Sequence, residues 1–319
     1  MATASGSNGR LSYVKESTYG TTPGSPTMLK LVGLTFGESI GASMEEVKSN
    51  AITGGRALSD VRGGNFTISG SSGFELSYIN QEGVLESVFG DVTKTADTPS
   101  VGLTERVYKR GVLPSLTIEK GFTDLGQYFK YTGMKADKLS LSVNNNGLIS
   151  GSIDWVGQSS NASGTSLGIP SAATLKTILH SDSKIYQDTG TGYVELKSNE
   201  FSFEITNTLD ADSGRVIGYR NIQSLTEGIG EITGNLKVQF DGLSQYNIWK
   251  NEQFLGLKIV CGDMATQGIT FEFPKCLLTG SADPKIESSG TVFLTFNFRA
   301  VLDDVSNSDV IVTVVNNIA

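Results

Sequence analysis

Hydrophobic and polar residues alternate along most of this chain, which is the pattern of strands that bury one face and expose the other. Between Asn65 and Tyr78 the large apolar side chains stand at even positions, and polar or small residues stand between them. Turn-forming sequences, such as NNNG at 144–147 and SSG at 288–290, separate the alternating segments. The remaining segments are marked by Leu116 and Ile118, by Leu139, Leu141 and Val143, by Ile149, Ile153 and Trp155, by Phe201, Phe203 and Ile205, by Ile232, Leu236, Val238 and Phe240, and by Val292, Leu294, Phe296 and Phe298. The pattern predicts an all-β fold.

Helical periodicity is confined to three short segments. Gln81–Phe89 and Leu243–Lys250 each place their apolar residues on one side, which predicts a helix of two or three turns. Residues 171–180 follow Pro170 and predict a third short helix, because proline is favoured at a helix start.

The predicted elements repeat in order along the chain. Residues 64–89 align with residues 228–253 without a gap, and residues 128–157 resemble residues 269–300. Each first block ends in a predicted helix, and each second block is a pair of strands. The order predicts a duplication, with a first module at 1–157 that includes an N-terminal arm, a linker at 158–170 and a second module at 171–319.

Composition and charge narrow the possible functions. The chain has 319 residues, 38 of them glycine, and only 18% are charged. The formal net charge is −8 and no run of Lys or Arg exceeds two residues, which argues against sequence-independent binding of nucleic acid by basic residues. No window approaches a membrane span, and no secretion signal is expected at the start.

Candidate chemistry is sparse. The single histidine, His180, lacks an identifiable acidic partner, and neighbouring carboxylates such as Glu45–Glu46 and Asp303–Asp304 are typical of solvated loops. Cys261 and Cys276 lie in strand-like segments without a second ligand at metal spacing, so we expect two buried, unpaired thiols. GIGEITG at 228–234 lacks the lysine of a phosphate-binding loop. We therefore predict no catalytic residue, no metal site and no cofactor.

Several segments together resemble the major tail tube proteins of siphophages, the bacteriophages with long non-contractile tails. They are SYVKESTYGTTPGSP near the start, GGRALSDVRGGNFTISGSSGFELSY with INQEGVLESVFG after it, the central YKRGVLPSLTIEKGF and YFKYTGMKADKLSLSVNNNGLISGSIDWVGQ, and the late EFSFEITNTLD and GYRNIQSLTEGIGEITGNLKVQF. The resemblance covers nearly the whole chain and lies in the order of the motifs.

The resemblance implies two tandem β-sandwich or partial-barrel modules, each with one short flanking helix. It also implies subunits joined edge to edge into rings, and rings stacked into a tube that conducts DNA without binding it specifically. Single-copy members form hexamers, so a duplicated subunit implies trimers with pseudo-sixfold symmetry. Other implied partners are a tape-measure protein and tail terminator or baseplate proteins. The implied location is the virion, after assembly in the host bacterial cytoplasm and without membrane contact.

Two sets of residues are candidates for these roles. The long connections Met44–Gly63 and Asp210–Ile229 carry mixed charge, and we expect them to be mobile in the monomer and ordered by stacking, helped by residues 1–30. The stacking candidates are Glu45, Glu46, Lys48, Arg56, Asp60, Arg62, Asp210, Asp212, Arg215 and Arg220. The candidates for the lumen, taken from the polar faces of strands, are Glu75, Ser77, Glu119, Asp154, Glu204, Glu231 and Gln239.

Two other readings remain open from the residues. One is a different β-rich virion component, such as a minor tail protein or an adhesin. The other is a carbohydrate-binding or hydrolytic β-sandwich, which would use exposed aromatic platforms. Trp155 and Trp249 stand on the apolar sides of their segments, which favours a core position for both.

Overall fold

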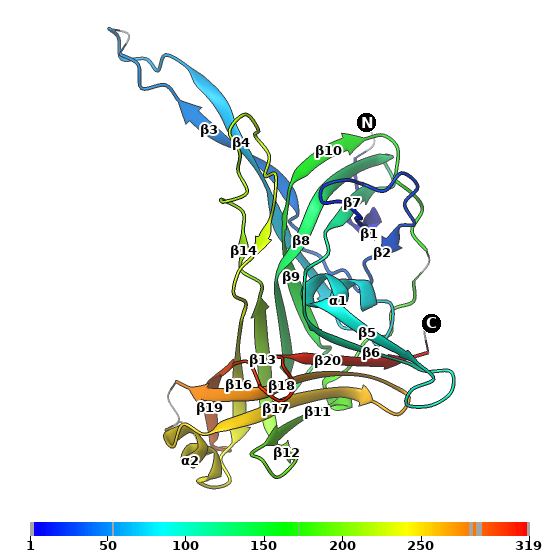
Figure 1. The fold of residues 1–319 in the computed structure, drawn as a ribbon, viewed down its shortest axis with the longest axis vertical. Helices are drawn as coiled ribbons and strands as arrows, with labels where there is room; N and C mark the ends of the chain where they lie inside the picture. The colour runs from blue at the N-terminus through cyan, green and yellow to red at the C-terminus, as the bar shows by residue number, and fades with distance from the viewer. Residues whose placement is uncertain (1–2, 53, 172, 281–282, 285–288, 318–319) are drawn as a thin grey trace.

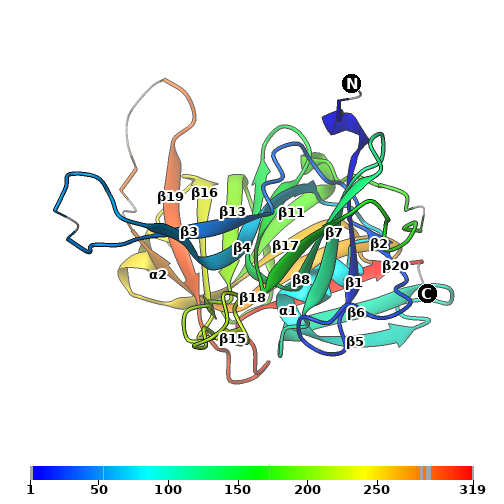
Figure 2. The same ribbon diagram turned by 90° about the horizontal axis from the view of Figure 1, so that it is seen from above.

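The computed structural model describes residues 3–52, 54–171, 173–280, 283–284 and 289–317. Over these residues the chain consists mainly of antiparallel β-strands, and the all-β prediction is confirmed (Figure 1). The strands form one hydrogen-bonded network and a separate two-stranded ribbon. A long hairpin projects from the body, as both views show (Figures 1 and 2).

One sheet runs through the whole molecule, and we name it the shared sheet. Neighbouring strands in it are hydrogen-bonded and antiparallel. In spatial order its strands are β3 (Gly41–Lys48), β4 (Val61–Glu75), β9 (Ser150–Gly157), β8 (Gln127–Asn144), β13 (Ser198–Thr206), β16 (Glu231–Gln239) and β19 (Phe293–Ala300).

Two flanking sheets pack on the shared sheet. The first consists of β2 (Leu29–Lys30), β1 (Gly9–Lys15), β7 (Leu116–Phe122), the first half of β8 and β10 (Ser159–Ser163). The second consists of β12 (Val194–Leu196), β11 (Ser183–Asp188), β17 (Phe254–Asp263), β18 (Gln267–Thr279), β20 (Ile311–Asn316), β6 (Thr104–Arg110) and β5 (Gly90–Ala96). The separate ribbon is β14 (Leu209–Asp210) with β15 (Thr226–Glu227).

Two of the three predicted helices are present. They are α1 (Glu82–Phe89) and α2 (Ser244–Lys250), and both lie within one residue of the predicted bounds. The helix predicted at 171–180 is wrong over the described residues, which include the isolated bridges of Thr177 to Ser77 and of Leu179 to Leu148. The two 3-10 turns are η1 (Gly6–Asn8) and η2 (His180–Asp182).

The core lies between the sheets and follows the alternation of the sequence. Five phenylalanines, contributed by β13, β18 and β19, form a cluster of rings whose neighbouring centroids lie 5.0 to 6.5 Å apart. Trp155 on β9 is buried and its indole Nε1 donates a hydrogen bond to the Ser72 hydroxyl at 2.8 Å, while Trp249 is partly buried against the same core. Trp155 is therefore a core residue, as predicted, and burial of these apolar surfaces supplies the main stabilising term.

The strand pairings repeat from one half of the chain to the other. The pairs β1–β7, β3–β4, β4–β9, β7–β8, β8–β9 and β8–β10 recur as β11–β17, β13–β16, β16–β19, β17–β18, β18–β19 and β18–β20. The register recurs too, since Gly70 lies opposite Trp155 and Gly234 lies opposite Phe298.

The two halves also differ in one respect, and the predicted linker between them is partly a strand. The β5–β6 hairpin has no counterpart in the described part of the second half, and β6 pairs with β20 from the end of the chain. The predicted linker at 158–170 is not a free connection, because Ser159–Ser163 form β10 against β8.

Candidate functional site

The face of the shared sheet opposite the core is polar and hollowed. The hollow has a volume of about 670 Å³ and is open to solvent. Serine, threonine and asparagine side chains from adjacent strands lie opposite one another across it, as in the row from Ser150 through Ser142 and Ser202 to Asn235. This surface, which we name the polar face, crosses from the first half of the chain to the second at the β8–β13 pairing.

Most charges on the polar face are paired. Lys138 Nζ lies 3.4 Å from an oxygen of Asp154 and 3.6 Å from one of Glu204, and Arg299 lies 3.4 Å from Glu231. Partial burial lowers the pKa of Lys138, but the Glu204 and Asp154 carboxylates outweigh it, so the pKa lies above its usual value. The face therefore presents hydroxyls and amides together with neutralised charges, and few unpaired cations.

The predicted lumen residues separate into two groups. Glu75, Asp154, Glu204, Glu231 and Gln239 lie at register positions of the polar face. Ser77 does not, because it is buried and its hydroxyl accepts a hydrogen bond from the backbone N–H of Lys176 at 3.0 Å. The assignment of Ser77 to an exposed face is therefore wrong.

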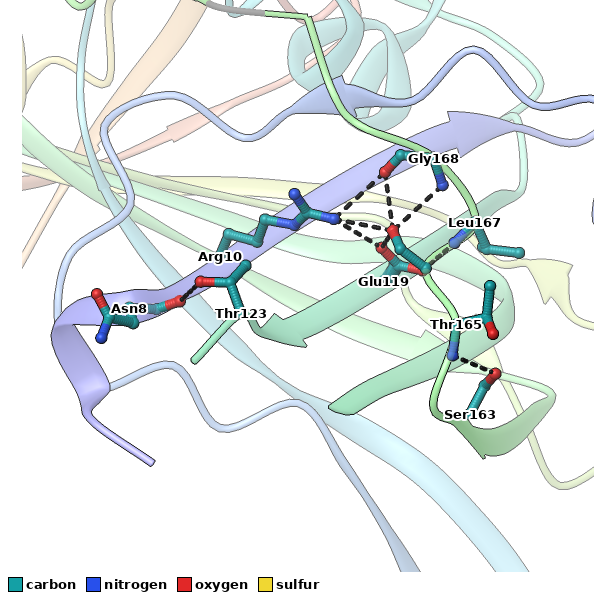
Figure 3. Close-up of polar contacts among 9 residues, drawn as sticks. Asn8, Arg10, Glu119, Thr123, Ser163, Thr165, Leu167 and Gly168 are labelled. Carbon is teal, nitrogen blue, oxygen red and sulfur yellow. Dashed lines mark hydrogen bonds and ion pairs between the residues drawn. The ribbon is translucent and has the colours of Figure 1, made fainter. Parts of the chain in front are cut away.

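Glu119 on β7 is also buried, so its assignment to an exposed face is wrong too. Its carboxylate accepts hydrogen bonds from the Ser166 hydroxyl at 2.7 Å and from the backbone N–H of Leu167 at 2.6 Å (Figure 3). The Arg10 guanidinium on β1 lies 3.4 Å from the same carboxylate and donates to the Gly168 carbonyl at 3.2 Å. Glu119 thus fastens the segment after β10 onto the first flanking sheet.

The predicted stacking segment at 44–63 is largely a β-hairpin, which we name the arm. Strand β3 pairs with β4 up to Lys48 opposite Val61, so both ends of this predicted mobile connection are regular strand. The arm leaves the body and exposes both its faces (Figure 1). Its charged candidates are Glu45, Glu46, Lys48, Arg56, Asp60 and Arg62, all exposed, with Arg62 bound to Asp60 at 2.9 Å and Lys48 near Glu46 at 3.5 Å.

Apolar side chains are exposed on the arm as well. Ile52 is 99% exposed, and Met44, Val47, Leu58 and Val61 are about half exposed. Such a concentration of exposed apolar residues on a projecting element is typical of a surface that another protein covers.

The second predicted stacking segment, 210–229, braces the base of the arm. Arg220 donates to the Gly64 carbonyl at 2.7 Å and its guanidinium lies 4.6 Å from the Phe66 ring centroid. Arg215 donates to the Phe66 carbonyl at 3.3 Å and lies 3.7 Å from Asp212. Asp210 accepts hydrogen bonds from the side chain and backbone of Ser213, which lower the pKa of its carboxyl. The two segments, more than 140 residues apart, therefore form one assembly of contacts, which the sequence alone did not predict.

The described residues carry little reactive chemistry. Cys261 and Cys276 are buried and unpaired, as predicted, and burial raises the pKa of both thiols, that of Cys261 to about 12. His180 Nδ1 lies 3.3 Å from the Gly147 carbonyl oxygen. Within the described ranges no three His, Cys, Asp or Glu residues are grouped to hold a metal ion, and no helix there has the length and apolarity to cross a membrane.

Comparison with known proteins identifies the family. A family model described as phage tail tube protein matches residues 6–300, which is nearly the whole chain. No curated protein matches the chain. The extent of the family match and the all-β architecture agree, and the chain belongs to the phage tail tube protein family.

Proposed function

We propose that this chain is the major tail tube subunit of a phage with a long non-contractile tail, and that it closes into rings whose stacking makes the DNA-conducting tube. The observation that carries the proposal is the polar face, which runs without interruption across both halves of a family member. The chain acts as a structural virion component, without catalysis.

The repeated pairings support a two-module subunit. The modules are those of the sequence pattern, 1–157 and 171–319, with 158–170 between them, and β10 of this connecting segment completes the first module as β20 completes the second. Six pairings and their register recur, which is far more than two unrelated sandwiches would share. Single-copy members of the family are expected to form rings of six, so two modules per chain make the closed ring a trimer with pseudo-sixfold symmetry. Cyclic closure leaves no sheet edge free.

In this proposal the polar face lines the lumen. Glu75, Asp154, Glu204, Glu231 and Gln239 lie there among neutral serine, threonine and asparagine side chains. DNA phosphates bind to unpaired Lys and Arg. On this face Lys138 and Arg299 already have carboxylate partners, and Lys237 lies over the Phe293 ring at 5.3 Å. A net charge of −8 adds repulsion within a Debye length of about 8 Å. DNA then passes without being held.

The arm and its brace are suited to contacts between stacked rings. The arm projects beyond the body and carries both charged and apolar exposed residues, while Arg215 and Arg220 fix its base. The tube then encloses the tape-measure protein in its lumen. Its two ends contact tail terminator or baseplate proteins. Assembly takes place in the cytoplasm of the host bacterium.

Electron microscopy and native mass measurement of the purified protein test the proposal. We expect hollow tubes or rings of uniform diameter, and a smallest ring species with the mass of three chains. A chain that stays monomeric under all assembly conditions contradicts the function, whereas rings of six chains contradict only the two-module ring.

A further inference from the structure

Within the chain, one strand pairing joins the two halves of the shared sheet. The strands that are equivalent to this pair by the repeat lie at the edges of the sheet and, within the described residues, do not pair with each other. Inside the chain β13 pairs with the second half of β8, with Ile205 opposite Leu139 and Thr206 opposite Lys138. This pairing joins the two halves of the shared sheet. The inference rests on the proposed ring and names the surfaces that close it.

The repeated pairings identify the counterpart of each strand. Thr206 lies opposite Glu231 on β16 as Ser43 lies opposite Thr67 on β4, so β3 corresponds to β13. Lys138 lies opposite Asp154 on β9 as Thr279 lies opposite Asn297 on β19, so the end of β18 corresponds to β8.

Both counterparts are unpaired on one side over the described residues. Over these residues β3 pairs with β4 alone. On its other side, β18 pairs with β17 only as far as Leu277, so Thr279 has a partner, Asn297, on the β19 side only. Ser43 and Thr279 are exposed. An edge strand with free N–H and C=O groups is a template for another strand.

Burial at equivalent positions supports a missing neighbour. Ile205 is 0% exposed at the internal junction, but its equivalent on β3, Ala42, is exposed. The position two residues earlier matches in both segments, because Phe203 and its equivalent Ile40 are both buried. The chain is therefore buried at Ile40, just before β3, as it is at Phe203. It becomes exposed at Ala42, where a second copy of the chain would cover it.

We propose that β3 of one copy pairs antiparallel with the end of β18 of the next copy, in the register that places Ser43 opposite Thr279. Each copy offers both surfaces, so the contact is head to tail and closes into a ring. The polar face then continues from one copy to the next, because Thr279 and Asn297 belong to the same row as Asn235.

The two kinds of junction differ in charge. Lys138, Asp154 and Glu204 form an ion-paired group at the internal junction. Their equivalents at the junction between copies are Thr279, Asn297 and Gly41, which carry no charge. Salt therefore has little effect through these three positions on the association of copies within a ring.

Cysteine cross-linking of the full chain tests the register. Directly opposite residues of an antiparallel pair have Cβ atoms about 4.5–5.5 Å apart, close enough for a disulfide with a small adjustment. In assembled S43C/T279C protein, oxidation is expected to convert most chains into covalent multimers that end at the ring size. Wild type and either single variant are expected to give no such ladder, because Cys261 and Cys276 are buried.

The matched control is S43C/N235C. Asn235 lies in the same row of the polar face as Thr279, but two strands further from the edge. In the proposed register it is three strand spacings, about 14 Å, from residue 43 of the next copy, and must not cross-link. Equal ladders for both double variants, or none for S43C/T279C in protein that forms rings, overturn the register and leave the tube function standing. Absence of rings from wild type overturns the proposed function instead.

Hydrogen exchange on the unmodified chain gives a reading that needs no variant. Alternate amides of residues 41–44, those that face away from β4, are expected to gain protection when monomers assemble into rings, by tenfold or more in exchange rate. Unchanged exchange there, in protein that has assembled, contradicts the pairing.

Discussion

Single residues show how distant segments change the meaning of a local pattern. Glu119 and Glu16 are both buried carboxylates that accept several hydrogen bonds, Glu16 from the backbone N–H of Gly20 and Gly133 and from the hydroxyls of Ser115 and Thr117. Buried charges of this kind are retained where donors surround them. Both side chains hold loops against the first flanking sheet.

Replacing Glu119 by alanine should destabilise the protein by about 3 kcal/mol, because Arg10 and the N–H of Leu167 lose a buried acceptor. Urea denaturation measures the change in the free energy of unfolding. The control is Glu204→Ala, whose carboxylate is exposed and paired with Lys138, and which should cost about 0–1 kcal/mol. Equal losses for the two variants would show that the buried contacts of Glu119 contribute no more to stability than an exposed ion pair does.

At the scale of elements, the arm combines a regular hairpin with an exposed surface. The strands up to Lys48 and from Val61 are paired with each other, and the segment 210–229 supports them from one side. A hairpin that packs on little else gains stability from a partner that covers it. In the proposed tube, the arm is therefore the element whose contacts a neighbouring ring completes.

Replacing residues 49–60 by a short Gly-Ser turn should leave a folded monomer that no longer stacks into tubes, because the core of the sheet is untouched. A gentler variant, I52S/L58S, keeps the length of the arm and removes two exposed apolar side chains. Its control is I169S, which is 92% exposed elsewhere on the chain. Circular dichroism checks folding and electron microscopy measures tube length. Normal tubes from both arm variants would refute the stacking role.

At the scale of the whole molecule, two extended strand pairings join the two halves over the described residues. The β8–β13 pairing unites the shared sheet, and the β6–β20 pairing ties a hairpin of the first half to the C-terminal strand. One connected hydrophobic cluster contains buried residues of both halves. The halves therefore share stabilising contacts along two borders.

The monomeric protein should unfold in a single cooperative transition, because opening either half exposes core and breaks strand pairing that the other half uses. Differential scanning calorimetry measures this as a calorimetric enthalpy equal to the van't Hoff enthalpy. Two separate heat-absorption peaks would show that the halves are energetically independent.

Much of the local structure followed from the order of the residues. The alternation predicted the strands and their buried residues, and the two helices and two buried thiols are where the pattern placed them. These features depend on side-chain periodicity and turn chemistry within a few residues, so a single sequence carries enough information to predict them.

Tertiary structure alone decided which polar positions face solvent and which connections are ordered. Ser77 and Glu119 look exposed by periodicity, yet segments about 50 to 100 residues away cover them. The predicted helix at 171–180 is absent over the described residues, and the predicted linker contributes β10. Local patterns report the polarity of each strand face, but they do not say which distant strand, loop or second copy of the chain will cover it. That choice is made by long-range pairing and burial, which are settled only when the whole chain packs.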